Sequence, residues 1–431
     1  MTRRQLLASF AAAAAPPAAA TPSPRQLRWH ALEFYGFLHF TMNTFTDKEW
    51  GYGDENPSRF NPTAFDADQI VEGLAAAGMK GVILTCKHHD GFCLWPTKTT
   101  EHSVKHSPFR NGKGDVVKEI ADAARRRKLS FGVYLSPWDR NHPQYGKPEY
   151  VQVYREQLRE LLTQYGPIFE VWHDGANGGD GFYGGAREKR TIDKRSYYDW
   201  PATWDMVRKL QPNAVIFSDV GPDIRWVGNE SGFANETCWA TYDPVGPDGG
   251  PAAPGHTRYK EGGTGHRQAQ RWLPAECDVS IRPGWFWHEN QNEKVKTPRQ
   301  LMDLYYKSVG RGASFLLNVP PDRRGLLHEA DVASLRTLGN ALRATFAKRE
   351  TTFDLIRLRE DIRHGQRIDA IEIDIEEPSG WRTIARATSV GACRIIRLDQ
   401  PVTAKKARYR VTQSSAPPKI TEFGLYKEQG L

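Results

Sequence analysis

The chain has 431 residues, of which 39% are hydrophobic and 26% are charged, and its formal net charge is +8. This composition is typical of globular proteins, and the length is sufficient for one large barrel of roughly 250 residues or more together with a smaller domain. The basic residues are dispersed, and their densest run, residues 125–128, follows a predicted helix, where cations complement the helix dipole. A nucleic-acid-binding surface is therefore a weak interpretation of the charge.

The first twenty residues have the features of an export signal. Paired Arg3 and Arg4 resemble a twin-arginine motif, an Ala-rich apolar stretch follows, and residues 18–20 form a small-residue cleavage site. We therefore expect export of the folded protein to the periplasm or the exterior, with an accidental arginine pair in a disordered terminus as the alternative. No segment approaches the ~20 apolar residues that span a bilayer, so no stable membrane association is expected.

Helical and strand patterns alternate along the first 320 residues. Helices are predicted over residues 66–78, 115–127, 148–164, 200–210 and 297–309, and strands over 35–38, 81–85, 130–135, 168–172, 214–218 and 313–319. This alternation predicts an α/β fold with a parallel sheet. An open doubly wound sheet has the same period, but polar clusters follow successive strands, which favours a (β/α)8-like TIM barrel with its site at the carboxyl ends of the strands. Residues 243–265 are rich in Pro and Gly and are predicted to be one long loop.

The pattern changes near residue 350. From Thr351 onward, runs such as 368–373 and 407–411 alternate with period two, and no long helix is predicted. We therefore expect three parts: a signal peptide over residues 1–20, a catalytic barrel over 21–350, and a small C-terminal β-sandwich over 351–431. The five scattered cysteines lack CxxC spacing, so they predict neither a disulfide framework nor a zinc site.

Asp174 is the most informative polar residue. It follows the predicted strand 168–172 and precedes a Gly-rich segment, and Trp172 lies two residues back on the same strand face. Barrel enzymes place catalytic carboxylates at this position of a parallel strand. The alternative is an ordinary Asp that caps the following turn.

Other polar and aromatic residues lie at or near predicted strand ends and could bind a substrate rich in hydroxyl groups, which needs neutral donors and acceptors and an aromatic wall. They are His39, Glu49, Trp50, His88, His89, Tyr134, Trp172, Glu230 and Trp287. A metal site built from His39, His88, His89 and His173 is the alternative. Adjacent histidines in an extended segment point to opposite sides, however, so we expect His88 and His89 not to bind one ion together.

Five segments resemble glycoside hydrolase family 29, the α-L-fucosidases. They are residues 36–45, 49–50, 87–92, 132–136 and 172–175, of which the Lys-His-His-Asp-Gly-Phe element at 87–92 is the most specific. The resemblance covers residues 30–350 in the family's motif order. Residues 225–230, Arg-Trp-Val-Gly-Asn-Glu, resemble the branch that prefers α-1,3/1,4-linked fucose.

The resemblance implies a retaining mechanism with two carboxylates and neither cofactor nor metal. Asp174 occupies the nucleophile position, and Glu230 is the predicted general acid/base, with Glu236, Glu276 and Glu289 as rivals. The fucose hydroxyls and ring would contact His39, Glu49, Trp50, His88, His89, Tyr134 and Trp172, and Trp287 would cover the apolar methyl side. Fucosylated oligosaccharides or glycoconjugates are the expected partners, with a metal-dependent barrel hydrolase or a non-catalytic fucose-binding protein as alternatives. The segment 178–195 is predicted to shape the leaving-group side, without a predicted conformation.

Overall fold

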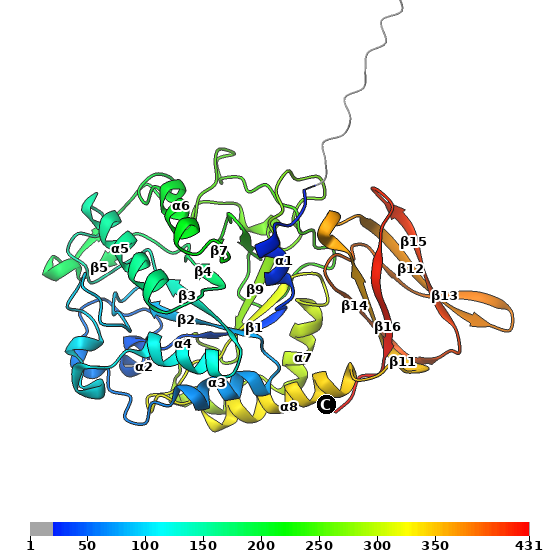
Figure 1. The fold of residues 1–431 in the computed structure, drawn as a ribbon, viewed down its shortest axis with the longest axis horizontal. Coiled ribbons are helices and arrows are strands. Elements are labelled where there is room, and N and C mark those ends of the chain that lie inside the picture. The colour runs from blue at the N-terminus through cyan, green and yellow to red at the C-terminus, as the bar shows by residue number, and fades with distance from the viewer. Residues whose placement is uncertain (1–19, 431) are drawn as a thin grey trace, which may run out of the picture.

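The computed structural model describes residues 20–430, so the predicted export signal lies outside the described residues except for Ala20. These residues form a closed barrel of eight parallel strands in the order β1-β10-β9-β8-β7-β4-β3-β2, followed by antiparallel sheets (Figure 1). The predicted TIM barrel with a C-terminal β-sandwich is therefore confirmed. No helix of the described residues is long and apolar enough to cross a membrane.

The barrel closes because its first strand pairs on both sides. Gly36 of β1 is in register with Val82 of β2 on one side and with Leu317 of β10 on the other. The strands are β1 (Phe34–Leu38), β2 (Gly81–Lys87), β3 (Ser130–Leu135), β4 (Glu170–Trp172), β7 (Val215–Ser218), β8 (Ile224–Trp226), β9 (Ala275–Ser280) and β10 (Ser314–Asn318). All are parallel, so their carboxyl ends meet at one end of the barrel.

Helices cover the outside of the barrel and begin at side-chain caps. Asp66, Asp115 and Thr297 each accept a backbone N–H of the first turn of the helix that follows, which satisfies donors with no partner inside the helix. The helices are α1 (Pro24–His30), α2 (Met42–Thr46), α3 (Ala67–Ala76), α4 (Val116–Arg126), α5 (Glu149–Gln164), α6 (Trp200–Leu210), α7 (Pro298–Lys307) and α8 (Glu329–Thr345). The five predicted helices correspond to α3 to α7.

Two barrel strands, β8 and β9, and three helices, α1, α2 and α8, were not predicted. β8 has three residues, too few to show a period, and β9 carries Glu276 and Asp278, which face the barrel interior and give the strand an unusually polar pattern. Between β8 and β9 the described chain has no α-helix, only the 3-10 turn Tyr259–Glu261, so the predicted loop 243–265 is a loop. α8 extends past the last strand and was also absent from the predicted elements.

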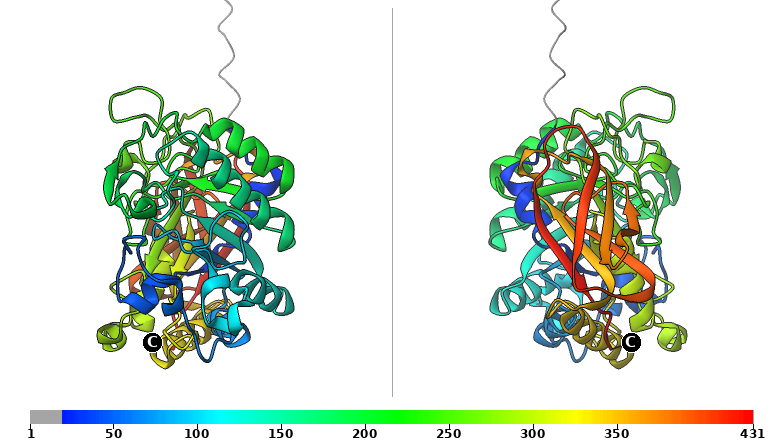
Figure 2. Two further views of the ribbon diagram at one scale, coloured as in Figure 1. Left: turned by 90° about the vertical axis from the view of Figure 1, so that its left-hand side faces the viewer. Right: turned by 90° about the vertical axis from the view of Figure 1, so that its right-hand side faces the viewer.

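The C-terminal region is a sandwich of two three-stranded antiparallel sheets within the described residues, β14-β11-β16 and β13-β12-β15. The strands are β11 (Thr352–Glu360), β12 (Ile368–Glu377), β13 (Gly380–Ala387), β14 (Arg394–Thr403), β15 (Ala407–Ser414) and β16 (Ile420–Tyr426). Alternating residues such as Ile371, Ile373 and Ile375 fill the space between the sheets. The sandwich lies on one side of the barrel (Figures 1 and 2).

The sandwich packs against the long β8–β9 connection. The Gln366 side chain accepts from the Ala240 N–H at 2.9 Å and donates to the Cys238 carbonyl, and Arg267 pairs with Asp369. The sandwich therefore restrains the loop that begins directly after β8, where Glu230 lies.

Candidate active site

A cavity of about 110 Å³ opens at the carboxyl ends of the barrel strands. Its volume is below the several hundred cubic ångströms of pockets that hold drug-sized molecules, so it suits one small ligand group. It is lined by Phe37, His39, Glu49, Trp50, His88, His89, Tyr134, Trp172, Asp174, Ala176, Glu230, Asp278 and Trp285. The structure thus brings together all the predicted site residues except Trp287.

Asp174 lies directly beyond β4 with both carboxylate oxygens held. Its Oδ1 accepts from the Ala176 N–H at 2.7 Å, and its Oδ2 accepts from the Tyr134 hydroxyl at 2.8 Å. Burial raises the pKa of the Asp174 carboxyl above its ordinary value, while these two hydrogen bonds lower it by stabilising the carboxylate. The arrangement orients an anionic oxygen in the cavity and leaves the side chain partly exposed.

A glycine behind Asp174 permits the close packing of three loops. A Cβ on Gly175 would lie 2.2 Å from Asp219 Oδ2, and a Cβ on Gly255 would lie 2.2 Å from the Gly175 carbonyl oxygen. Asp219 follows β7 and accepts from the Gly255 N–H at 2.7 Å. Burial, together with repulsion from Asp174, raises the pKa of Asp219 to about 6. This contact fixes the turn that carries Asp174 against the β8–β9 connection.

The segment after β8 places Glu230 at the cavity through three local constraints. The Arg225 guanidinium is fully buried and donates to the carbonyls of Gly262, Leu273 and Trp239, which anchors the long loop beside β8. Gly228 has φ +90°, and a Cβ there would lie 2.2 Å from the Tyr259 carbonyl oxygen. The chain can therefore turn sharply here, and Glu230 reaches the cavity, where the Trp285 Nε1–H donates to its Oε2 at 3.3 Å.

The three rival acids lie elsewhere. Glu236 pairs with Arg394 and Arg311 toward the sandwich, and Glu289 is exposed and does not line the cavity. Glu276 is fully buried inside the barrel.

Asp278, which was not predicted, also lines the cavity. The Trp226 Nε1–H donates to it at 2.6 Å. Burial raises the pKa of Asp278 well above its ordinary value, and the nearby Glu230 and Glu276 add to the rise. The polar pattern of β9 was the only sequence signal for this residue.

The three cavity histidines are neutral, because burial lowers the pKa of His39 and His89 to about 3 and that of His88 well below its ordinary value. The tautomers follow from hydrogen-bond partners. Asn318 Oδ1 lies 2.9 Å from His39 Nδ1, while its amide nitrogen donates to Ser280 and to the Trp285 carbonyl, so His39 Nδ1 is the donor. His39 Nε2 is therefore an acceptor.

The same reasoning assigns the other two rings. Ser136 Oγ donates to the Trp138 carbonyl, so it accepts from His89 Nδ1 at 2.7 Å and leaves His89 Nε2 as an acceptor. Asn43 donates to His88 Nδ1 at 3.3 Å, which makes His88 Nε2 a donor. The cavity thus offers both donors and acceptors without a positive charge, which suits hydroxyl groups.

The expectation that His88 and His89 point to opposite sides was wrong. β2 ends at Lys87, so the two histidines do not lie in an extended strand, and their ring centroids are 4.1 Å apart on the same side. His173 lies away from them, with its Nδ1 at 2.7 Å from the Tyr154 hydroxyl. Residues 20–430 contain no group of three or more His, Cys, Asp or Glu side chains placed to hold a metal ion.

Trp285, rather than Trp287, lines the cavity. Trp287 is buried beneath Arg323, whose guanidinium lies 5.5 Å from the indole centroid, whereas Trp285 packs 5.0 Å from the His39 ring. Glu49 holds this loop by accepting from the Trp285 and Phe286 N–H groups and contacting His288 at 2.6 Å. The sequence pattern alone does not reveal which of two alternating indoles faces the cavity.

Trp50 stands at the entrance with 54% of its surface exposed. Its ring meets those of His89 and Trp138 edge to face, with centroids 5.2 and 5.6 Å away. The segment 178–195 contains a hairpin, β5 (Gly179–Gly181) and β6 (Glu188–Arg190), and Tyr183 accepts from the Trp138 Nε1–H at 3.0 Å. The hairpin therefore supports the entrance wall.

Trp172 forms the inner wall above a buried pair of acids. Its ring stacks on Phe217 with centroids 4.1 Å apart, and its Nε1–H donates to Glu276 at 2.7 Å. Glu276 also accepts from the Tyr35 hydroxyl. Burial and the neighbouring Glu276 raise the pKa of Glu170 well above its ordinary value, which favours the protonated form of this acid.

Comparisons with known proteins show the family of this chain. A family model described as alpha-L-fucosidase matches residues 25–345. The chain is 40% identical to alpha-L-fucosidase 1 of Arabidopsis thaliana, over 95% of this chain and 88% of the relative. A glycoside hydrolase 29 family member from an unknown rumen bacterium is 43% identical with a TM-score of 0.90, over 96% of this chain and 78% of that one. A Ruminococcus gnavus family 29 fucosidase in complex with fucose is 28% identical with a TM-score of 0.83, over 98% of each chain.

Proposed function

Because the chain belongs to the alpha-L-fucosidase family, glycoside hydrolase family 29, we propose that it removes terminal α-1,3/1,4-linked L-fucose from glycans with net retention. The protein is a glycoside hydrolase, and α-L-fucosidase is its activity. The observation that supports the finer proposal is that Asp174 and Glu230, from the ends of different strands, line one cavity. Retaining enzymes use two such carboxyl groups about 5–5.5 Å apart.

In the first step Asp174 is the nucleophile and Glu230 the general acid. An Asp174 oxygen forms a bond to the anomeric carbon while the bond from that carbon to the glycosidic oxygen breaks, and the Glu230 proton passes to the departing oxygen. The Ala176 N–H and the Tyr134 hydroxyl hold the Asp174 carboxylate in position before the reaction. Their hydrogen bonds also favour the ionised form that attacks.

In the second step Glu230 acts as the general base. It takes a proton from water as the water oxygen attacks the anomeric carbon, and the bond to Asp174 breaks. Glu230 regains its proton and Asp174 its charge. Two inversions at the same carbon return the original configuration.

Neutral groups around the cavity hold the sugar. The Nε2 atoms of His39 and His89 accept from hydroxyl groups, and the Nε2–H of His88 donates to one. Trp172 and Trp285 supply apolar surface for the ring and the methyl group, a role first predicted for Trp287. Trp50, at the exposed entrance, contacts the sugar to which fucose is attached.

The linkage preference rests on residues 225–230. The Arg-Trp-Val-Gly-Asn-Glu segment places Glu230 by the constraints of Arg225 and Gly228, and it resembles the family branch that acts on α-1,3/1,4 linkages.

Export through the twin-arginine route is supported by Arg3 and Arg4. Replacing both by lysine should retain the activity in the cytoplasmic fraction, and unchanged localisation would contradict this part of the proposal.

Two measurements test the proposed reaction. Proton NMR during hydrolysis of an aryl α-L-fucoside should show α-L-fucose as the first anomer, and β-L-fucose first would contradict retention. A panel of α-1,2-, α-1,3-, α-1,4- and α-1,6-fucosylated oligosaccharides should show the α-1,3 and α-1,4 compounds cleaved faster by roughly tenfold or more. A chelator should leave both results unchanged, whereas inactivation would favour a metal-dependent hydrolase.

A further inference from the structure

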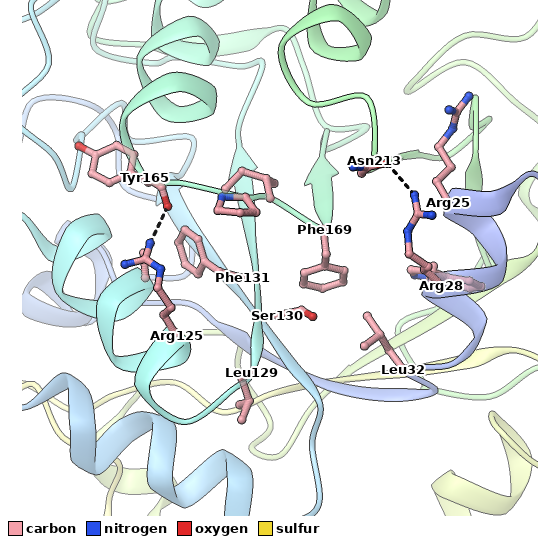
Figure 3. A pocket seen from close by; sticks show the side chains of 14 residues that line it. Arg25, Arg28, Leu32, Arg125, Leu129, Ser130, Phe131, Tyr165, Phe169 and Asn213 are labelled. Carbon is pink, nitrogen blue, oxygen red and sulfur yellow. Dashed lines mark hydrogen bonds between the residues drawn. The ribbon is translucent and has the colours of Figure 1, made fainter.

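A second cavity, of about 530 Å³, is drawn in Figure 3. Its lining residues lie at the opposite end of the barrel from those of the active site. It is formed where the strands begin, by residues before or at the starts of β1, β3, β4 and β7 and by one side of α1 and α4. The lining residues that carry the argument are Arg25, Arg28, Trp29, Arg125, Phe131 and Phe169. None of them takes part in the proposed hydrolysis.

The inner surface of this cavity is apolar and held in place. Phe169, directly before β4, packs against two glycines: a Cβ on Gly132 would lie 3.0 Å from its ring, and one on Gly81 would lie 3.3 Å away. The Phe169 ring also meets Tyr35 edge to face at 5.4 Å. Trp29 is fixed by its Nε1–H, which donates to the Tyr35 hydroxyl at 2.8 Å. The aromatic wall is therefore preorganised, which reduces the entropy lost on binding.

The rim of the cavity is cationic. Three arginines line the cavity, and none of the described lining residues is acidic. Arg25 pairs with Asp223, and Arg125 pairs with Asp122 at 2.6 Å. Arg28 donates to the neutral Asn213 side chain at 2.9 Å and forms no ion pair within residues 20–430. Figure 3 shows Arg28 and Arg125 on opposite sides of the Phe131 and Phe169 rings.

We propose that this cavity is a binding site for an aromatic carboxylate. A planar ring fits against Phe131 and Phe169, whose faces and edges favour offset or edge-to-face contact with another ring. The carboxylate then reaches the Arg28 guanidinium, which has the fork geometry for two parallel hydrogen bonds and no competing acid. The volume falls within the range of small-molecule sites and admits a ligand of two or more fused rings. The three arginines disfavour a cationic ligand.

The test is a fluorine NMR titration of the full-length protein with 6-fluoro-2-naphthoate, compared with its neutral amide, 6-fluoro-2-naphthamide. We expect the acid to bind with a Kd on the order of 0.1–1 mM and the amide roughly tenfold more weakly, because only the acid makes charge-assisted hydrogen bonds. Equal binding of both probes, or no binding of the acid, would overturn the proposal.

Three variants locate the probe. Arg28→Gln should weaken binding of the acid roughly tenfold and leave the amide unchanged. Ala121→Phe, which adds a ring to the buried α4 side of the cavity, should abolish binding of both. Arg126→Gln is the matched control for the loss of an arginine. Arg126 is exposed on α4, the helix of Ala121, where it pairs with Asp68 and does not line the cavity. Its replacement should change binding less than twofold. Unaltered fucosidase activity shows that each variant is folded.

Two further outcomes would assign the cavity or the probe differently. Competitive inhibition of aryl fucoside hydrolysis by the acid would place the probe in the active site, which contradicts the proposal. A dimer that the acid or Ala121→Phe dissociates in sedimentation equilibrium would assign the cavity to a second copy of the chain, which also contradicts it. The expected result is neither of these: the acid leaves hydrolysis unchanged, and the sedimentation profile does not respond to the acid.

Discussion

The two ends of the barrel differ in chemistry although the same strands build both. The carboxyl end has a cavity of about 110 Å³ with three neutral histidines and several carboxyl groups, whereas the amino end has a cavity of about 530 Å³ with aromatic walls and arginines. One chain of contacts joins them: Trp29 to Tyr35, Tyr35 to Glu276, and Glu276 to Trp172. Because both ends share the same barrel interior, their different chemistry must come from the loops and the strand-terminal side chains at each end.

The largest expected loss of activity comes from replacing the nucleophile at the carboxyl end of the barrel. Asp174→Asn should lower kcat/KM for an aryl α-L-fucoside by about 10⁴-fold or more, because the amide cannot form the covalent intermediate. Asp180→Asn is the control, since Asp180 also follows β4 but is exposed and does not line the cavity, and it should cost less than about tenfold. Similar losses in both variants would contradict the assignment.

Glu230→Ala should have the next largest effect, and the effect should depend on the leaving group. We expect a loss of about 10²–10³-fold in kcat/KM for a fucosyl oligosaccharide and a much smaller loss for an aryl fucoside with a good leaving group, because protonation of the departing oxygen is the missing step. Azide should accelerate the variant. Glu236→Ala, which removes an acid outside the cavity, should show neither property.

Replacement of the two alternating indoles should separate binding from folding. Trp285→Ala should raise KM by roughly tenfold, because Trp285 lines the cavity and donates to Glu230. Trp287→Ala should leave KM within about twofold and lower the unfolding temperature instead, since Trp287 is buried outside the cavity. The reverse pattern would restore the original prediction for Trp287.

Replacing Glu170 of the buried pair Glu170 and Glu276, which lies between the two ends, should change the free energy of unfolding more than the turnover rate. Burial raises the pKa of Glu170 well above its ordinary value, so the folded state holds a proton that the unfolded chain releases above pH ~4.3. The stabilisation is fully present below that pH and is lost as the pH rises through the folded-state pKa. Glu170→Gln, which stays neutral at every pH, should flatten this loss in denaturant titrations between pH 5 and pH 9. An unchanged slope would contradict the raised pKa of Glu170.

The smallest expected effect is at the amino end. Arg28→Gln should change kcat/KM for aryl fucosides by less than about twofold, because Arg28 is exposed and lies at the opposite end of the barrel from Asp174. A larger loss would show that the two ends are energetically coupled through Trp29 and Tyr35.

Much of the barrel was predictable because hydrophobic periodicity reports burial along one element at a time. The helices α3 to α7 and most strands follow such patterns. β8 is too short to show a period, and β9 carries inward acids, so neither resembles an ordinary buried strand. The long β8–β9 connection was predicted only as a loop, and its packing against the sandwich depends on contacts such as those of Gln366 with Ala240 and Cys238.

By itself, the sequence determined which residues gather at the carboxyl end, because parallel strands must all end at the same edge and Asp174, His39 and His88 each follow such a strand. Only the tertiary structure decided which side chains face the cavity: both His88 and His89, Trp285 instead of Trp287, and Asp278 in addition to the predicted set. It also decided the histidine tautomers, which depend on partners such as Asn318 that lie far away in sequence. The physical reason is that a pattern within one element encodes burial, whereas the direction and protonation of a side chain depend on neighbours that meet it only when the barrel closes.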